Sequence, residues 1–269
     1  MASEFSGKVV IVTGSNSGFG EATALLLASR GANVTLCGRD EERLKSVLDK
    51  IVKANGGNKD RFLAIPGDLN DSKVRQEIIN KTVEKFGRLD VLVANAAVAG
   101  DHNTILSTTE DAYDTILDTN LKSSFFLIKE AIPHLEKTRG NIVNISSIAS
   151  NTVIPELTTY SLTKAALDHL TRCLAVDLGS KGIRVNAVNP GYIQTLILRD
   201  FGDPIIVDRD AQVLEKGRTP LTGVVGGAQD VAEAVAFLAS DAARFITGEF
   251  IKVDGGRSYN GVLHFPPKG

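Results

Sequence analysis

The stretch that decides the fold is K8-V-V-I-V-T13-G-S-N-S-G18-F-G20-E-A-T-A-L-L-L-A-S-R30. It begins with a β-branched apolar run, typical of a buried strand, and turns through three glycines into an apolar helical pattern. Glycines let a backbone approach a pyrophosphate closely, and the helix N-terminus adds N–H groups and a favourable dipole. The spacing is G-x-x-x-G-x-G, and no Gly-Lys-Ser/Thr follows, which excludes a P-loop. Alone, the turn fits either a nucleotide cradle or a tight turn without ligand.

The alternation of short apolar runs and helical patterns continues along the whole chain. Strands that are apolar on both faces imply a parallel sheet covered by helices, and right-handed crossovers make it doubly wound. We therefore predict an α/β fold, a single-domain doubly wound (Rossmann) parallel sheet with helices on both faces, over residues 1–269. The expected strands are 8–13, 32–37, 61–66, 89–94, 141–146, 183–189 and 249–254, and the expected helices are 18–30, 40–54, 71–86, 113–136 and 160–178.

Residues 196–227 are the least regular part of the sequence. They follow the sixth expected strand, whose C-terminal end borders the predicted ligand crevice. Long irregular segments in compact domains are usually functional. We predict a substrate lid here; an ordinary surface excursion is the alternative.

Composition excludes several classes of protein. The net charge of −2, with 43% hydrophobic and 23% charged residues, is typical of a soluble globular protein and offers no basic surface for nucleic acid or membrane. The N-terminus resembles no secretory signal, and no run is long and apolar enough to span a membrane. The scattered histidines predict no metal site. Cys37 and Cys173 lie in apolar stretches and are expected to be buried and reduced, as in a cytoplasmic protein.

The second expected strand ends in C37-G38-R39-D40. In a nucleotide-binding fold, this segment is expected to lie near the adenosine ribose. An acidic residue near this point would bind the ribose hydroxyls, whereas Gly38 leaves space and the Arg39 guanidinium can bind a 2′-phosphate. A solvated arginine at a helix start is the alternative. Asp68, after the third strand, could accept from an adenine amino group or cap the loop that follows it.

Tyr160 and Lys164 are four residues apart and so share one helix face, and Ser147 lies thirteen residues before Tyr160. Free tyrosine has a pKa of about 10, and a nearby ammonium is expected to lower it. Tyr160 could then give a proton to a carbonyl oxygen or take one from an alcohol, while Ser147 holds the same oxygen. The spacing to Tyr160 favours Ser147 over Ser146 for this role. We expect Ser146 to be a strand-end residue.

In order and spacing, these motifs resemble those of the short-chain dehydrogenase/reductase family, over roughly residues 5–256. The resemblance implies a catalytic tetrad of Asn120, Ser147, Tyr160 and Lys164, in which the asparagine positions a water for proton relay. It also implies that lysine binds the nicotinamide ribose. The motifs that carry the resemblance are T13-G-x-x-x-G-F-G20, D68-L69, N95-A-A97, Asn120, Ser147, Y160-x-x-x-K164 and N189-P-G-Y-I-Q-T195.

The resemblance also implies a cofactor site, with Thr195 on the carboxamide and Arg39 where NADP-preferring members carry a basic residue. Two positions depart from the family pattern. Ala97 replaces the usual glycine, and Ser17 stands where many NADP-preferring members have a second basic residue. The implied cofactor-binding residues are Gly14, Ser17, Gly18, Phe19, Gly20, Arg39, Asp68, Leu69, Asn95, Ala96, Tyr160, Lys164, Pro190, Gly191, Ile193 and Thr195.

We therefore expect an NADP(H)-dependent oxidoreductase that interconverts a secondary alcohol and a ketone or aldehyde. An NAD-dependent member of the family and a catalytically silent NADP(H)-binding regulatory protein are the alternatives. A nucleotide-fold transferase is disfavoured, because Arg39 replaces the acidic residue its ribose site would need. The expected substrate is a small, lipophilic carbonyl compound, since the candidate lining residues are mostly apolar: Ala97, Val98, Ile154, Tyr192, Ile193 and Leu196.

One apolar set on the 160–178 helix allows two interpretations. Packing on the sheet is the first. The family resemblance adds the second, in which this helix, helix 113–136 and the last strand form the contacts of a homotetramer. The set includes Leu162, Ala166, Leu170, Cys173 and Leu174.

Overall fold

The core of the protein is a seven-stranded parallel sheet with the strand order β3-β2-β1-β4-β5-β6-β7. The computed structural model describes residues 4–100, 104–193, 195, 197, 217–221, 224 and 226–260. The strand order reverses beside β1, so a crevice forms at the carboxyl ends of β1 and β4. The strands are β1 (Val9–Thr13), β2 (Asn33–Gly38), β3 (Phe62–Pro66), β4 (Val91–Ala94), β5 (Asn141–Ile145), β6 (Arg184–Pro190) and β7 (Phe250–Val253).

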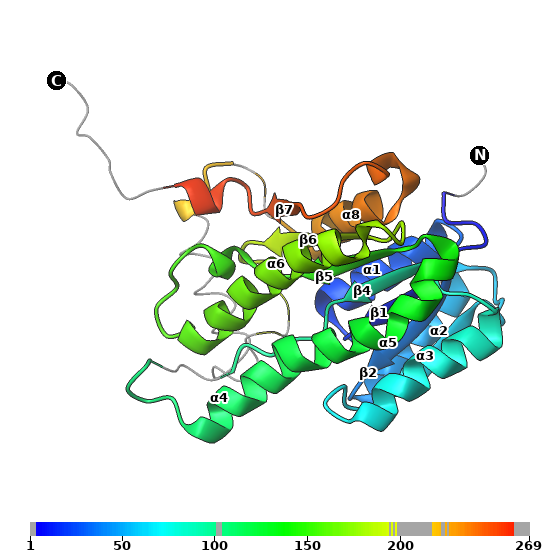
Figure 1. The fold of residues 1–269 in the computed structure, drawn as a ribbon, viewed down its shortest axis with the longest axis horizontal. Coiled ribbons are helices and arrows are strands. Elements are labelled where there is room, and N and C mark those ends of the chain that lie inside the picture. Colours follow the sequence, from blue (N-terminus) through cyan, green and yellow to red (C-terminus); the bar gives the residue numbers. More distant parts are fainter. Residues whose placement is uncertain are drawn as a thin grey trace.

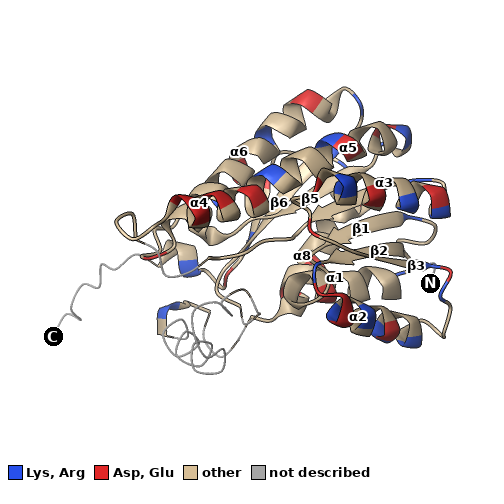
Figure 2. Ribbon diagram, turned by 90° about the horizontal axis from the view of Figure 1, so that it is seen from below, with Lys and Arg blue, Asp and Glu red and all other residues tan. Residues whose placement is uncertain are grey.

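Helices cover both faces of this sheet (Figure 1). Figure 2 shows α1, α2 and α8 on one face and α3, α5 and α6 on the other, with Lys, Arg, Asp and Glu on the outer sides of the helices. The predicted doubly wound α/β fold is therefore confirmed. The helices are α1 (Gly18–Ser29), α2 (Glu41–Ala54), α3 (Ser72–Phe86), α4 (Glu110–Leu117), α5 (Ser123–Thr138), α6 (Thr158–Gly179) and α8 (Ala228–Ala239), with a π-helical turn η1 (Asp118–Lys122) and 3-10 turns η2 (Ile148–Ser150), η4 (Asp241–Ala243) and η5 (Arg257–Tyr259).

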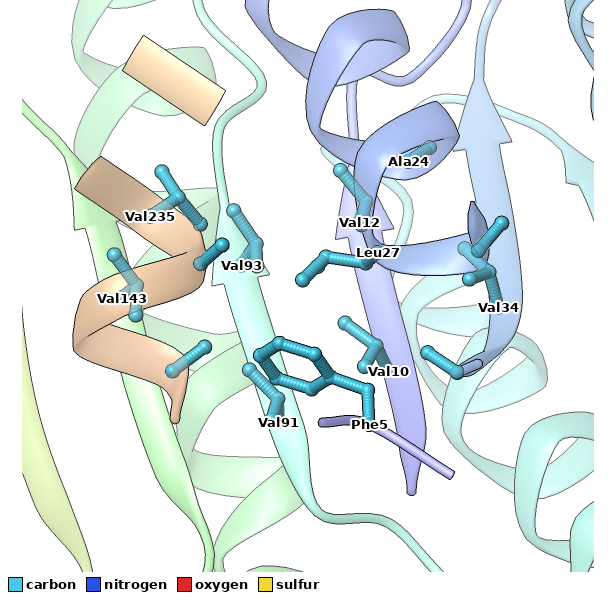
Figure 3. Packing of buried hydrophobic residues seen from close by; sticks show 14 of the residues in the cluster. Phe5, Val10, Val12, Ala24, Leu27, Val34, Val91, Val93, Val143 and Val235 are labelled. Atoms are coloured by element: carbon cyan, nitrogen blue, oxygen red, sulfur yellow. The ribbon is translucent and has the colours of Figure 1, made fainter. Parts of the chain in front are cut away.

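Strands β1 to β6 divide their side chains between two cores. On β1, Val10 and Val12 pack toward α1 and α8, whereas Ile11 packs toward α3 and α5. In the first core, Phe5 lies beside Val10 and Val91 (Figure 3). Because successive side chains alternate across a sheet, a strand buried on both faces needs apolar residues at every position. The mainly apolar runs of the sequence meet this requirement, except where a buried polar residue such as Asn144 on β5 has a hydrogen-bond partner.

Helix α6 packs on the sheet with a stripe that is partly polar. Thr163, Leu167 and Thr171 are buried, and Thr171 Oγ1 accepts a hydrogen bond of 2.9 Å from Asn144 Nδ2 on β5. The interpretation of Leu162 and Cys173 as core residues is wrong, because both are exposed on the opposite side of the helix. The reason is that polar side chains on this sheet face need polar partners, which the apolar stripe cannot provide.

The structure adds detail to the remaining expectations. The helix expected at 113–136 is present as the continuous helical run of α4, η1 and α5, which extends from Glu110 to Thr138 and contains the unpredicted π-helical turn η1. Cys173 is exposed rather than buried, while Cys37 is buried as expected. Helix α8 was not anticipated. Most of the predicted lid, 196–227, including Leu196, lies outside the described residues.

Candidate active site

A pocket of about 900 Å³ opens at the carboxyl ends of the strands. Residues that are far apart in the sequence meet in its wall, as the switch point between β1 and β4 requires. Gly20 and Asn120 were predicted as site residues but do not line this pocket. The predicted residues that do are Gly14, Ser17, Gly18, Phe19, Arg39, Asp68, Leu69, Asn95, Ala96, Ser147, Tyr160, Lys164, Pro190, Gly191, Ile193 and Thr195.

The glycine turn after β1 is clamped to the end of β4. Asn95 Nδ2 donates to the Thr13 carbonyl at 2.7 Å and to the Gly14 carbonyl at 3.2 Å, while Thr13 Oγ1 accepts from the Asn95 and Ala96 amides. Gly14 has φ +61°, and a Cβ there would lie 2.9 Å from Ala96 Cα. A Cβ on Gly20 would collide with the Gly14 carbonyl. Glycine at both positions therefore lets the turn fold tightly on itself.

The turn also presents the first amides of α1. Ser17 is the N-cap, and its side chain accepts no capping hydrogen bond. Ser17, Gly18 and Phe19 line the pocket, and a Cβ on Gly18 would lie 3.2 Å from Thr195, across the pocket. Free first-turn amides and the helix dipole form an anion site. These residues fit the pyrophosphate of a dinucleotide.

At the end of β2, Arg39 and Asp68 face each other. Arg39 Nη1 lies 4.0 Å from Asp68 Oδ2, and the two side chains are 51% and 47% exposed. Asp68 Oδ1 also accepts from the Asn70 amide, so it caps the following loop. An exposed ion pair of this length is weak. The guanidinium can therefore exchange its partner for a phosphate.

Two pocket-lining residues near Arg39, Asn16 and Arg43, were not predicted from the sequence. A Cβ on Gly38 would lie 2.9 Å from Asn16 Cγ, so the glycine makes room for the asparagine. Arg43 lines the pocket too, with its Nε 3.1 Å from Asp40 Oδ2. Arg43 is one turn into α2, so its position four residues after Arg39 was a usable signal.

Ser147 and Tyr160 meet beside the pocket, one from the loop after β5 and one from α6. Burial raises the pKa of Tyr160 to about 12, and a hydrogen bond with the Ser147 side chain opposes this shift. The expected net lowering of the Tyr160 pKa is therefore wrong for this state of the protein, because burial outweighs the effects that lower it. The Lys164 Nζ lies 5.5 Å from the centre of the Tyr160 ring and donates elsewhere, to the Ile145 carbonyl at 2.8 Å.

Lys164 is a buried cation, only 2% exposed. Desolvation lowers its pKa to about 8, and the charge of Asp168 opposes this change. The lysine is therefore mostly protonated at neutral pH. Its neighbour Ser146 donates from Oγ to the Lys164 carbonyl at 3.2 Å, as fits a strand-end residue that holds the helix.

Asn120 lies in the π-helical turn η1 and is buried. Its Oδ1 accepts from the Val98 amide at 2.8 Å, and its Nδ2 donates to the Val98 carbonyl at 2.8 Å and to Thr163 Oγ1 at 3.2 Å. The side chain thus joins η1 to α6 and to the loop after β4. π-helical turns occur frequently at functional sites.

The far part of the pocket wall is mostly apolar. Ala97, Ile154, Tyr192 and Ile193 line it as predicted. Val98 does not, because its main chain is bonded to Asn120. Sequence reasoning missed several lining residues that come from loops without a motif: Val153, Pro155, Leu157, Ile197, Arg218 and Arg257.

Comparison with known proteins now adds to this geometry. The family model described as enoyl-(acyl carrier protein) reductase matches residues 14–258. A protein of Thermotoga maritima, named as an uncharacterized oxidoreductase, is 40% identical over 257 residues, which cover 94% of this chain and 98% of that protein. The chain belongs to the short-chain dehydrogenase/reductase family. It is thus an oxidoreductase that acts on CH–OH or C=O groups with a nicotinamide cofactor.

Solved structures of family members agree. A Caenorhabditis elegans short-chain dehydrogenase/reductase of unknown function, solved with cofactor, is 36% identical with a TM-score of 0.87, covering 96% of this chain and 98% of that one. A 3-ketoacyl-(acyl-carrier-protein) reductase from Brucella melitensis, complexed with NADH, is 30% identical with a TM-score of 0.83. That match covers 94% of this chain and 99% of the other.

The described part of the chain offers neither a metal-binding cluster nor a membrane-spanning helix. It contains no group of three or more His, Cys, Asp or Glu that could hold a metal ion. Within the same residues, no helix is both long and apolar enough to cross a membrane.

The tight turn after β1 generates a prediction about cofactor binding. Gly14→Ala should weaken binding of the reduced nicotinamide cofactor by about tenfold or more, because a methyl group would push the turn away from Ala96. Cofactor fluorescence titration measures this. Gly56→Ala is the matched control, since Gly56 has a similar φ of +72° but nothing within 4 Å of a built Cβ. Equal losses in both variants would mean that backbone strain, not the close approach, governs binding.

Proposed function

We propose that the protein interconverts a secondary alcohol and a ketone or aldehyde with NADP(H), using Tyr160 as the acid/base. The observation that carries this proposal is the convergence of Ser147, Tyr160 and Lys164 on the wall of one pocket that also contains the glycine turn. An acid, a hydrogen-bond donor and a cation beside a dinucleotide site are the groups that carbonyl reduction needs.

Each residue has a role that follows from its surroundings. When bound, the cofactor supplies the hydride in reduction and accepts it in oxidation. Ser147 Oγ holds the substrate oxygen beside Tyr160, whose hydroxyl gives that oxygen its proton. Because burial raises the pKa of Tyr160 to about 12, the residue is kept in the protonated form that reduction requires.

Lys164 contributes its charge. Its mostly protonated ammonium lies near the tyrosine ring and stabilises the phenolate left after proton transfer. The positive charge that a bound oxidised nicotinamide brings would lower this raised pKa of Tyr160, which suits the reverse reaction. We assign proton relay through a water to Asn120, as the family resemblance implies.

The choice of NADP(H) rests on Arg39. Its half-exposed guanidinium lines the pocket at the end of β2. Among the described residues, its one ion-pair partner is the Asp68 carboxylate, at 4.0 Å. A 2′-phosphate would be a stronger, bidentate partner. The alternative is an NAD-dependent enzyme, and it is supported by the Brucella relative, whose structure was solved with NADH.

We further propose a lipophilic carbonyl substrate, because the wall formed by Val153, Ile154 and Leu157 is apolar. Arg218 and Arg257 add positive charge to the same pocket. A panel of apolar ketones, each with and without a carboxylate, separates a purely lipophilic substrate from one with an acidic group.

The cytoplasmic location expected from the sequence stays a prediction, as does a single catalytic domain.

A homotetramer is also proposed. Exposed apolar side chains gather on the helices that the family resemblance assigns to subunit contacts, with Leu162 54% exposed and Val176 81% exposed on α6, and Phe125 exposed on α5. Exposed apolar surface of this kind marks protein interfaces. Light scattering at micromolar concentration should give four times the chain mass, and a monomer would contradict the proposal.

Removal of the Tyr160 hydroxyl tests the chemistry. Tyr160→Phe should lower kcat by about a hundredfold or more, since general acid catalysis contributes at least that much, while the Kd for NADPH changes little. Steady-state kinetics with a carbonyl from the panel and a fluorescence titration measure the two quantities. Tyr113→Phe, which removes a hydroxyl from an exposed ring on α4, is the control and should leave both unchanged. Retained turnover in Tyr160→Phe would refute the acid/base role.

Cofactor choice has its own test. Arg39→Ala should weaken NADPH binding by about tenfold or more and leave NADH binding nearly unchanged, because only the 2′-phosphate needs the guanidinium. The two Kd values are compared in the variant, in the wild type and in Arg244→Ala, which removes an exposed arginine that does not line the pocket. Equal losses for both cofactors would mean that Arg39 does not recognise the phosphate.

A further inference from the structure

A buried polar cluster lies directly behind the Ser147 loop. Its centre is Asn189, near the end of β6. Asn189 Nδ2 lies 2.9 Å from Asp168 Oδ2, 3.1 Å from Ser150 Oγ and 3.2 Å from the Ser147 carbonyl oxygen. One amide group thus joins β6, α6 and the loop that carries Ser147.

The Asp168 carboxylate decides which way this amide faces. A carboxylate only accepts hydrogen bonds, so Nδ2 and not Oδ1 of Asn189 must point toward it. With Nδ2 fixed there, the same group can donate to the Ser147 carbonyl. A flipped amide would place two oxygens against each other at both contacts.

The Ser147 backbone needs such an anchor. Ser147 is the N-cap of the short turn η2, and its Oγ accepts from the Ala149 amide at 3.1 Å. The same hydroxyl is bonded to Tyr160. The direction of Ser147 Oγ therefore depends on a single turn that is held from behind by Asn189.

Asp168 also lies one turn after Lys164 on helix α6. The titratable groups that face the Lys164 ammonium from its own helix are Tyr160 and Asp168, while β5 contributes the Ile145 carbonyl. The charge of Asp168 raises the pKa of Lys164 against the effect of burial. Asp168 Oδ1 is buried and has no hydrogen-bond donor among the described residues, so this carboxylate is compensated mainly by Asn189 and Lys164.

We infer that Asp168 is a positioning residue for the reaction, which holds Ser147 through Asn189 and places a carboxylate one turn of α6 beyond Lys164. The inference rests on the proposed function, because it assigns Asp168 to the same site. A carboxylate here links the two groups that flank Tyr160. It contacts neither substrate nor cofactor, so its effect is transmitted through those two residues.

The test compares Asp168→Asn and Asp168→Ala with the wild type. Asparagine keeps an acceptor for Asn189 but removes the charge, whereas alanine removes both. In Asp168→Asn the pKa of Lys164 should fall, read by NMR titration of ¹³C-lysine-labelled protein with the Lys164 signal assigned from Lys164→Arg. Its kcat should fall by about tenfold, with the KM for NADPH within about twofold, and the alkaline limb of its kcat profile should move to lower pH.

Asp168→Ala should lose more turnover than Asp168→Asn, because Ser147 also loses its anchor. Asp177→Asn, the same change at an exposed position of α6, should match the wild type throughout. A wild-type Lys164 titration and pH profile in Asp168→Asn would overturn the inference, even if Asp168→Ala lowers Tm. The NMR titration needs no substrate, so it tests the link between Asp168 and Lys164 even if the protein turns over no carbonyl. Absence of turnover would refute the proposed function but not this link.

Discussion

The arrangement of the site depends on one buried hydrogen bond, from the Lys164 ammonium on α6 to the Ile145 carbonyl at the end of β5. A buried cation without such a partner is costly, so the bond fixes the height of the helix along the strand. Ser146 Oγ bonds the Lys164 carbonyl, and Asn144 bonds Thr171 two turns later. These contacts hold α6 so that Tyr160 reaches the pocket at the carboxyl edge of the sheet, beside Ser147.

Much of this could be predicted from the sequence, because the relevant signals are local. Strands buried on both faces leave unbroken apolar runs, and Val10, Ile11 and Val12 distribute themselves between two cores by alternation alone. Asp71, the first residue of the helix expected at 71–86, is the N-cap of α3 and accepts from the Lys73 amide. Once the parallel sheet is assigned, its carboxyl edge must gather the glycine turn, Ser147 and the residues after β6.

The remainder depended on contacts between distant residues. The π-helical turn η1 inside helix 113–136 is not visible in hydrophobic periodicity, yet that turn carries Asn120. The inward stripe of α6 is polar because Asn144 on β5 bonds Thr171 and Asn189 on β6 bonds Asp168, so apolar spacing pointed to the wrong side of the helix. The pKa of Tyr160 rises because burial outweighs a cation that is occupied by a carbonyl. A four-residue spacing predicts proximity, but it cannot predict where the ammonium donates.

The central claim is that a buried, protonated Tyr160 acts as the acid and that its proton is released only once positive charge enters the pocket. Ultraviolet difference titration of the wild type against Tyr160→Phe, with and without NADP⁺, measures this most directly. The account predicts a midpoint at about pH 12 for the free protein and a lower midpoint with NADP⁺. A midpoint near neutrality in the free protein, or one that NADP⁺ leaves unchanged, would contradict it.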